Sequence, residues 1–568
     1  MTVRIAIVVG YFLILLGIGW AARRRSRPGL TDYFVASRTT SPLVLFLTMA
    51  ATNFSAFTVF GFAGAGWQSG YAFYPIMAFG TGFMALTFVL IGRPVQRLGK
   101  IYGLITPPEL VAQLTGSSSL RLLFFIVMTV FTLPYLAMQP MAAGYALQSL
   151  LGIPYFAGAT LITAIMLGYT FLGGFRGVAW TDTFQGGMMI TLLLVAVVMI
   201  ASKFGGLASA NDLAASAQPA LFARPGLDGL YSPAMWFGYM ALWFLCDPMF
   251  PQLFQRFYAA RDARALTATM SLYPLLTGFL FLLPVTIGVL GRISYPQLPA
   301  GASADQILPL MLSLHVPPVI EALVLTAALA ALMSTLDSQL LTLSSMFARD
   351  VCEPLRDRFV GGSGKPDPSE HSRLPNWVGK GFVVVLAMIG LAIAARPPAT
   401  FLAIATQTFT GLAVLFPTVI AALYWKRMTA WAGIGSILVG EGLVVAAYFK
   451  QLPTFGTLPV IPILIVSTVV LILISLLPGQ QQKPQVIIAP RTLKPRALVL
   501  WSVAFGALFF AGLDVWNWGD ARVWLLGYPW WVWMFAGLCV VLSIAFWIFG
   551  RMLNRASEAP VSQDDTLP

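Results

Sequence analysis

The chain has few charged residues for its length. Only 10% of its 568 residues are Asp, Glu, Lys or Arg, whereas 58% are hydrophobic. A soluble globular protein of this size needs more charged surface, so this composition excludes a water-soluble fold. Apolar stretches of roughly 18 to 25 residues, which as helices cross about 30 Å of hydrocarbon, recur from end to end. We therefore predict an all-α polytopic protein of the plasma (inner) membrane.

Cysteine and histidine are also scarce. The three cysteines, Cys246, Cys352 and Cys539, have neither the spacing of a disulfide framework nor that of a metal site. The two histidines, His315 and His371, fall in predicted loops, and no nucleophile motif accompanies them. The sequence therefore gives no support to a membrane enzyme.

No water-soluble domain and no single basic patch is present, although the net charge is +13. The positive charge is spread over many short loops, which excludes nucleic acid as a partner and indicates membrane topology with weak attraction to lipid. Because Lys and Arg concentrate in cytoplasmic loops, the distribution predicts an outer N-terminus and an inner C-terminus. Inner loops would hold clusters such as Arg93, Arg97 and Lys100 or Arg256, Arg261 and Arg264, and outer loops single residues such as Arg224.

We predict about fifteen spans of the length that a bilayer requires. They are 3–22, 43–69, 72–92, 122–149, 154–173, 182–204, 233–255, 267–291, 319–346, 380–396, 400–424, 431–449, 459–477, 498–514 and 523–549. Tryptophans between the last two spans suit an interfacial aromatic belt; they are Trp516, Trp518, Trp524, Trp530 and Trp531.

Two of these spans are interrupted. The second, "LTMAATNFSAFTVFGFAGAG", places Asn53 and Ser55 at mid-membrane, and the seventh, "LWFLCDPMFPQLFQRF", places Asp247 and Pro248 there. Proline lacks a backbone donor, and unwound backbone at bilayer depth is tolerated only where it lines a cavity. Broken helices at equivalent positions of two halves indicate an inverted-repeat transporter that binds its solute between the breaks. The alternative is that Pro and Gly are ordinary in membrane helices and the offset is accidental.

The predicted organisation follows from the five-span offset between the breaks. It comprises a first span with its cytoplasmic loop (1–42), two five-helix repeats (43–204 and 205–424), flanking spans (425–480), two extra C-terminal spans (481–556) and a disordered cytoplasmic tail (557–568).

Three segments carry a resemblance to a known family. They are 47–71, "GGFRGVAWTDTFQGGMM" at 173–189 and "AALMSTLDSQLLTLSS" at 330–345. Together they resemble the sodium/solute symporter family of proline, pantothenate, monocarboxylate, sugar and sialic-acid carriers, over about residues 1–477. The resemblance implies a leucine-transporter-type core of five plus five inverted helices. It also implies sodium-coupled import of a small organic solute, with a monocarboxylate, pantothenate or an amino acid favoured.

The resemblance further implies a sodium ion between the break of the second span and the ninth span. Its ligands would be the carbonyls of Ala51, Phe54 and Ala331 and the hydroxyls of Ser334 and Thr335. Oxygen ligands at a half-helix end suit a hard cation, and residues three and four apart share one face of a helix. The alternative is that these hydroxyls bond to carbonyls of their own helix or join neighbouring helices.

Two acidic residues lie near this predicted site. In the family, the position of Asp182 is associated with sodium coupling, although an interfacial Asp that caps a helix is equally expected. Asp337 and Ser338 lie about one turn beyond the sodium ligands. With Asp182 they form either a second cation position, a coupling relay, or ordinary bonds between helices.

Polar residues that can face a central cavity are the candidates for solute binding. They are Asn53, Ser55, Gln139, Trp243, Asp247, Thr406 and Gln407. Each can instead join helices. A carboxylate at bilayer depth is costly, so Asp247 is protonated, pairs with a solute amine, or caps the unwound stretch. Rival functions are a proton-coupled or uncoupled carrier and a solute sensor on the same fold; the oligomeric state stays open.

Overall fold

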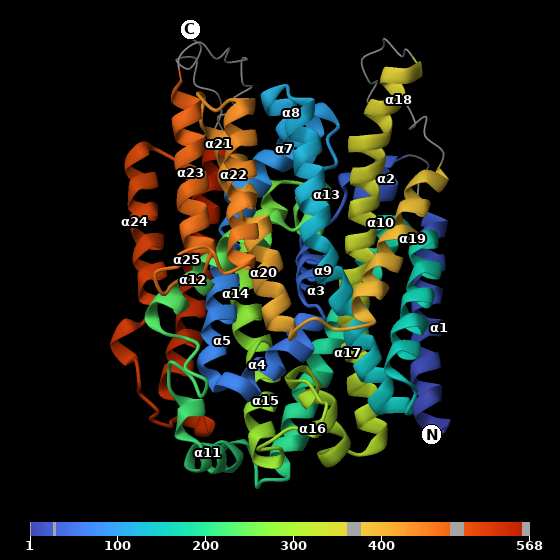
Figure 1. Cartoon of the computed structure of the whole chain (residues 1–568), viewed down its shortest axis with the longest axis vertical. Coiled ribbons are helices and arrows are strands. Elements are labelled where there is room, and N and C mark those ends of the chain that lie inside the picture. The colour runs from blue at the N-terminus through green and yellow to red at the C-terminus, as the bar shows by residue number, and fades with distance from the viewer. Residues whose placement is uncertain (1, 26–29, 361–375, 478–492, 559–568) are drawn as a thin grey trace.

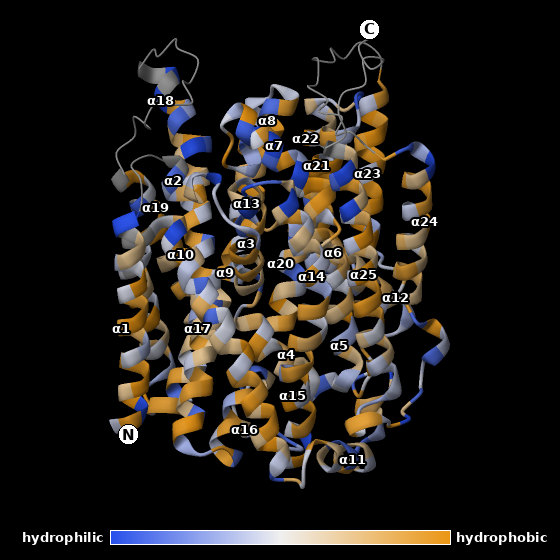
Figure 2. Cartoon of the chain, turned by 180° about the vertical axis from the view of Figure 1, so that it is seen from behind, coloured by the Kyte–Doolittle hydropathy of each residue, from blue (hydrophilic) through white to orange (hydrophobic). Residues whose placement is uncertain are grey.

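A computed structural model describes residues 2–25, 30–360, 376–477 and 493–558. Within these ranges the secondary structure is helical, with two isolated bridges and no strand. Ten helices among the described residues are long and apolar enough to cross a membrane, and shorter apolar helices accompany them. The N-terminus lies at the same end of the molecule as α11 and α16, whereas α7, α8 and α18 lie at the opposite end (Figure 1). Hydrophilic residues gather at that second end (Figure 2).

The helices fall on every stretch that was predicted to span the membrane. In the first half they are α1 Thr2–Arg25, α2 Leu30–Val35, α3 Pro42–Asn53, α4 Phe62–Ser69, α5 Phe73–Pro75, α6 Gly82–Met84, α7 Arg93–Tyr102, α8 Pro107–Thr115, α9 Ser118–Leu151, α10 Tyr155–Ser202, α11 Leu207–Ala217, α12 Pro233–Cys246 and α13 Pro251–Ala259. In the second half they are α14 Ala263–Leu280, α15 Leu282–Ser294, α16 Ile307–His315, α17 Pro318–Met346, α18 Glu353–Val360, α19 Asn376–Ala394, α20 Phe401–Ala413, α21 Leu415–Tyr424, α22 Ala430–Tyr448, α23 Val460–Leu476, α24 Pro495–Ala511 and α25 Trp530–Glu558.

Both predicted interruptions are present. After α3 the backbone of Phe54 is extended, with φ −87° and ψ 95°, and helix resumes in a π-helical turn, η2 (Phe57–Gly61), that leads into α4. α12 passes into a 3-10 turn, η7 (Asp247–Met249), and Phe250 is extended before α13 starts at Pro251. Proline has no N–H to donate to the helix, which explains the second break. The first break contains no proline, and polar residues around it satisfy the freed backbone groups.

The predicted fifth and sixth spans form one helical run, α10, with a bend at Gly174. This residue has φ 54°, a conformation that glycine adopts without steric cost. A Cβ at Gly174 would lie 2.8 Å from the Tyr33 ring. The two spans are therefore joined by a glycine bend, and the second half of α10 starts earlier than the predicted boundary at 182.

Next to the first break, two glycines allow α4 and α15 to approach each other closely. A Cβ at Gly66 of α4 would lie 2.5 Å from the Val285 carbonyl of α15, and one at Gly288 would lie 2.0 Å from the Ala63 carbonyl. Glycine therefore allows α4 and α15 to pack backbone to backbone, as small residues do in membrane bundles. This contact holds the half-helix that follows the break.

The C-terminal helices cover one side of the bundle. α25 packs along α14 and the π-helical segment η4 (Ile76–Thr81), and Phe505 and Phe509 of α24 contact Phe83 at 6.4 and 5.4 Å between ring centroids. α25 continues to Glu558, so the first two residues of the predicted disordered tail, 557 and 558, are helical; the rest of that prediction, 559–568, lies outside the described residues.

Two arginines that were assigned to loops are buried, contrary to the prediction. Arg224 is fully buried in an ion pair with Asp514, and Arg256 is 1% exposed within α13. The predicted aromatic belt is also only partly right, because Trp531 is fully buried, whereas Trp516 and Trp524 are exposed. Hydropathy cannot separate a charged residue in solvent from one that a distant carboxylate neutralises.

Candidate functional site

The break after α3 lies against the middle of α17. The Ser334 hydroxyl is 2.8 Å from the Ala51 carbonyl and 2.9 Å from the Ala331 carbonyl. The Thr335 hydroxyl lies 3.4 Å from the Ala331 carbonyl and 3.1 Å from that of Thr52. A hydroxyl carries only one proton, so Ser334 can donate to one of its two carbonyls at a time. The result is a compact set of neutral oxygens shared by two helices.

Four of the five predicted sodium ligands thus meet, namely Ala51, Ala331, Ser334 and Thr335. All four are buried, with exposures from 0 to 3%. Phe54 lies at the start of the extended stretch and donates its N–H to the Ala50 carbonyl at 2.9 Å. Among the described residues, no hydrogen bond links the Phe54 carbonyl to the other four. The Thr52 carbonyl, which was not among the predicted ligands, lies closer to the Thr335 hydroxyl than the Ala331 carbonyl does.

A buried ion pair lies one turn from these oxygens. Arg256 of α13 donates from Nη2 to Asp182 of α10 at 2.9 Å and to Ser338 of α17 at 2.9 Å. Its Nε donates to Thr48 of α3 at 3.1 Å, and Thr48 and Thr52 both donate to Asp182. One guanidinium therefore connects four helices from both halves of the chain.

This arrangement excludes the helix-cap interpretation of Asp182, and its role in sodium coupling stays a prediction. The residue lies inside α10, is fully buried and bonds across helices, so it is not an interfacial helix cap. Asp337 is also fully buried, and its Oδ1 lies 3.5 Å from the Ser338 hydroxyl. A positive charge from Arg256 occupies the space between Asp182 and Ser338.

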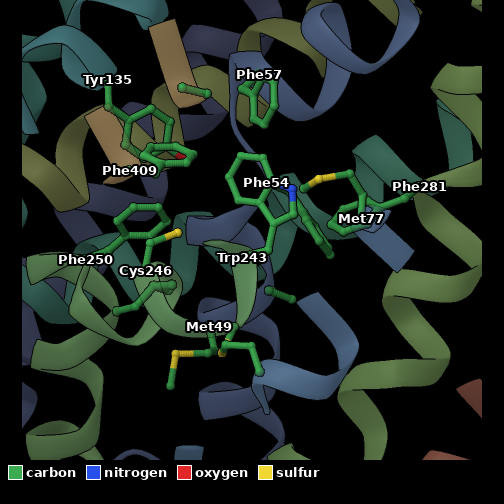
Figure 3. Packing of buried hydrophobic residues seen from close by; sticks show 14 of the residues in the cluster. Met49, Phe54, Phe57, Met77, Tyr135, Trp243, Cys246, Phe250, Phe281 and Phe409 are labelled. Carbon is green, nitrogen blue, oxygen red and sulfur yellow. The ribbon is translucent and has the colours of Figure 1, made fainter. Parts of the chain in front are cut away.

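A small cavity lies between the two breaks. Its volume is about 10 Å³, which is room for roughly one water molecule. Aromatic rings form most of its wall (Figure 3). The ring centroid of Phe409 lies 5.1 Å from that of Trp243, 4.6 Å from that of Phe250 and 5.1 Å from that of Tyr135. In this conformation the cavity is too small for an organic solute.

Polar groups from both breaks enter this cavity. Asn53 donates to the Tyr273 hydroxyl at 2.8 Å and approaches the Asp247 carboxylate at 3.5 Å. Asp247 is 3% exposed. The indole N–H of Trp243 and the hydroxyl of Thr81 are buried, and among the described residues neither has a hydrogen-bond partner. The cavity thus offers one carboxylate, one amide and two uncommitted donors within aromatic walls.

The structure brings only three of the predicted solute residues to the cavity wall: Asn53, Trp243 and Asp247. Ser55 accepts a hydrogen bond from the Phe57 N–H, and Gln139 accepts one from the Ala56 N–H at 3.1 Å. Both therefore satisfy backbone donors that the break leaves free.

The two predicted residues of α20 lie elsewhere, contrary to the prediction. Thr406 bonds to the Leu402 carbonyl of its own helix, and Gln407 is exposed. Sequence reasoning missed Thr81, Tyr135 and Phe409, which line the wall, because isolated polar and aromatic residues in apolar spans give no signal of their orientation.

Comparisons with known proteins agree with this architecture. A family model described as the sodium:solute symporter family matches residues 33–440. The sodium/pantothenate symporter of Haemophilus influenzae is 28% identical over 451 residues, which cover 77% of this chain and 88% of the relative. The sodium/proline symporter of Staphylococcus aureus is 26% identical over 479 residues, which cover 82% and 91% of the two chains.

Solved structures show the same fold. A sodium-coupled sialic acid symporter in a substrate-bound, outward-open state superimposes with a TM-score of 0.66 at 20% identity, over 83% of this chain and 98% of the other. A closed nucleobase-cation-symport-1 family transporter matches with a TM-score of 0.51 at 13% identity, over 79% and 94% of the two chains.

Proposed function

Because the chain belongs to the sodium:solute symporter family, we propose that it imports a small organic solute together with sodium by alternating access. It is an integral, multi-pass protein of the plasma membrane, and the named relatives are sodium-coupled symporters. The observation that carries the proposal is the set of neutral oxygens between the broken α3 and the middle of α17.

Sodium binds where Ser334 and Thr335 meet the carbonyls of Ala51 and Ala331. The two hydroxyls donate to these carbonyls at 2.8 to 3.4 Å. A cation at this place attracts all the lone pairs at once, so the hydroxyl protons turn away and every oxygen becomes a ligand. Phe54 belongs to the site if its carbonyl turns toward the ion. A cage without formal charge releases its ion readily to a cytoplasm that is low in sodium.

The solute binds between the breaks, in contact with Asn53, Trp243 and Asp247. A carboxylate within aromatic walls favours a positively charged group, through charge and cation–π attraction. The uncommitted donors of Trp243 and Thr81 favour an acceptor on the same solute. These features support an amino acid or a related amine above a monocarboxylate or pantothenate.

Coupling passes through Asp182, Ser338 and Asp337. The Arg256 guanidinium that joins Asp182 to Ser338 supports a relay between helices of the two halves. The same charge disfavours a second sodium ion at this place while the pair is closed.

The topology that we propose keeps fifteen crossings, with the N-terminus outside and the C-terminus inside. Two inverted five-helix repeats, 43–204 and 205–424, each begin with a broken span. The positions of α11 and α16 at the end that holds the N-terminus support this alternation (Figure 1).

The driving force is sufficient for accumulation. A membrane potential near 100 mV contributes about 2.3 kcal/mol per charge moved, and a tenfold sodium gradient adds about 1.4 kcal/mol. One sodium ion therefore supports roughly several-hundred-fold accumulation of a neutral solute.

The test replaces the two hydroxyls. Ser334→Ala with Thr335→Ala should abolish sodium-dependent uptake and the thermal stabilisation that sodium gives over choline, because a ligand stabilises only a state that binds it. Thr326→Ala is the matched control, since its hydroxyl lies in the same helix and bonds only to the Ala322 carbonyl among the described residues. Undiminished sodium dependence in the double variant would refute the site.

A proton-coupled carrier is the second candidate, because Asp247 is a buried carboxylic acid beside the cavity. Uptake in sodium-free buffer under an imposed pH gradient distinguishes the two. Proton-driven uptake that Asp247→Asn removes would favour the proton; uptake only with sodium favours the first proposal.

A further inference from the structure

A large apolar cavity lies on the outside of the bundle, between α12, α21 and α23. Its volume is about 450 Å³, within the range of about 300 to 1,000 Å³ that is typical of small-molecule sites. Side chains from all three helices form its wall, including Leu245, Phe416, Ile420, Ala421, Leu464 and Leu471. None of these residues lines the small cavity between the breaks. An apolar space of this size on the outside of the bundle suits a hydrocarbon chain.

Basic residues follow in the sequence directly after the last α21 residues that line this cavity. α21 ends at Tyr424, which with Trp425 lines the cavity, and Lys426 and Arg427 follow directly. The Tyr424 hydroxyl donates to the Leu90 carbonyl, three residues before Arg93 at the start of α7.

The two cations that follow Trp425 are available to a ligand. Lys426 and Arg427 are exposed, and among the described residues neither forms an ion pair. Tyr and Trp are the residues that accumulate at the level of lipid headgroups. α7 and α8 lie at the same end of the molecule as α21 (Figure 1), the end that the charge distribution predicts to be cytoplasmic.

We propose that this cavity binds an anionic glycerophospholipid of the inner leaflet. One acyl chain fills the space between α12, α21 and α23, and the phosphate lies against Lys426, Arg427 and Arg93. Basic pockets between membrane helices on the cytoplasmic side recognise anionic headgroups in this way. The site is independent of the proposed sodium ligands.

The bound lipid contacts a helix that also forms the solute cavity. Leu245 lies between Trp243 and Asp247 in the sequence, but it faces the outer cavity, whereas its two neighbours line the inner one. A lipid in the outer cavity therefore packs against the side of α12 that faces away from the solute cavity.

The experiment is native mass spectrometry of the purified full chain, incubated with phosphatidylglycerol or with phosphatidylcholine of the same acyl chains. We expect one phosphatidylglycerol to be retained in preference to phosphatidylcholine. Lys426→Gln with Arg427→Gln should remove this preference and weaken phosphatidylglycerol binding by roughly fivefold for each charge. Ala421→Phe, which fills the cavity, should weaken the binding of both lipids.

Arg551→Gln with Arg555→Gln is the control, because these residues are exposed near the end of α25, a helix that does not line the cavity. This pair should bind phosphatidylglycerol as the unchanged protein does. Equal binding of the two lipids by the unchanged protein would overturn the proposal. Full phosphatidylglycerol binding by Lys426→Gln with Arg427→Gln, or by Ala421→Phe, would also overturn it. Inorganic phosphate should not displace the lipid; displacement would identify a site for a free anion instead.

Discussion

Arg256 and Asp182 form an ion pair at 2.9 Å, with side chains that are 1% and 0% exposed. The pair joins α13, just after the second break, to the second half of α10. Through Ser338 it also reaches α17, one turn from the proposed sodium ligand Ser334. The guanidinium contacts α3, α10 and α17. A movement of α13 relative to these helices must therefore break these contacts.

Removing one partner of this pair should destabilise the protein strongly. Arg256→Gln leaves Asp182 buried without its cation, and such changes cost about 3 to 5 kcal/mol. Arg256→Gln with Asp182→Asn removes both charges and should recover much of this loss. Thermal unfolding in detergent measures both effects. Arg97→Gln, at an exposed position of α7, should change stability by less than about 0.5 kcal/mol. A double variant no more stable than Arg256→Gln alone would contradict the pairing.

The uncommitted donors of the solute cavity provide a second prediction. Thr81→Val keeps the shape of the wall but removes a hydrogen-bond donor, and Trp243→Phe removes the indole N–H while keeping an aromatic ring in the wall. Each should raise the KM for the solute by roughly three- to tenfold, the effect of one lost hydrogen bond, and leave the sodium dependence of thermal stability unchanged. Thr132→Val is the control, because Thr132 is also buried without a partner among the described residues but does not line the cavity. An unchanged KM in both cavity variants would exclude these donors from solute binding.

Sequence reasoning located the helices and both breaks because these features have local causes. Pro248 and Pro251 interrupt a hydrophobic run, and residues three and four apart place Ser334 and Thr335 on the same face as Ala331. Hydropathy and helical spacing are sufficient for such features.

What sequence reasoning missed depends on contacts between distant residues. Asp182 and Arg256 are 74 positions apart, and Arg224 and Asp514 are 290 apart. No spacing rule joins such pairs, and an arginine near the end of an apolar stretch is assigned to a loop by default. The inclusion of Gln407 among the solute residues failed for a related reason, because polarity within a span does not reveal which way a side chain faces.

Asp305 should make the stability of the protein dependent on pH. It is 2% exposed in the connection before α16 and accepts a hydrogen bond from the Phe401 N–H, at the start of α20, at 3.0 Å. Burial raises the pKa of Asp305 from 3.8 to about 7. Because the folded state holds a proton that the unfolded chain releases, this carboxyl favours folding most at low pH. Its contribution falls as the pH rises toward 7.

Asp305→Asn should therefore flatten the decrease of thermal stability between pH 5 and pH 8. The amide keeps an acceptor for the Phe401 N–H but does not ionise. Asp212→Asn, at an exposed position of α11, should leave the pH profile as it is. Identical slopes for the unchanged protein and Asp305→Asn would show that Asp305 does not titrate in this range.

The Arg224–Asp514 pair should hold the C-terminal helices to the connection between α11 and α12. Arg224 lies within a cage of three indole rings, 5.1 Å from Trp236, 4.6 Å from Trp518 and 4.8 Å from Trp531. Lysine keeps the charge but lacks the planar group that stacks on these rings. Arg224→Lys should therefore be destabilising, and Arg224→Met more so, because methionine leaves Asp514 buried without a cation.

Hydrogen exchange of the connection between α24 and α25 measures this effect directly. Its amides should exchange faster in Arg224→Lys and faster still in Arg224→Met, since one of them, the Gly519 N–H, donates to the Arg224 carbonyl at 3.0 Å. Arg522→Gln is the control on the same connection, because Arg522 is 76% exposed and a surface ion pair contributes only about 0 to 1 kcal/mol. Equal exchange in the arginine and methionine forms would mean that packing of α25 on α14, rather than the ion pair, holds these helices in place.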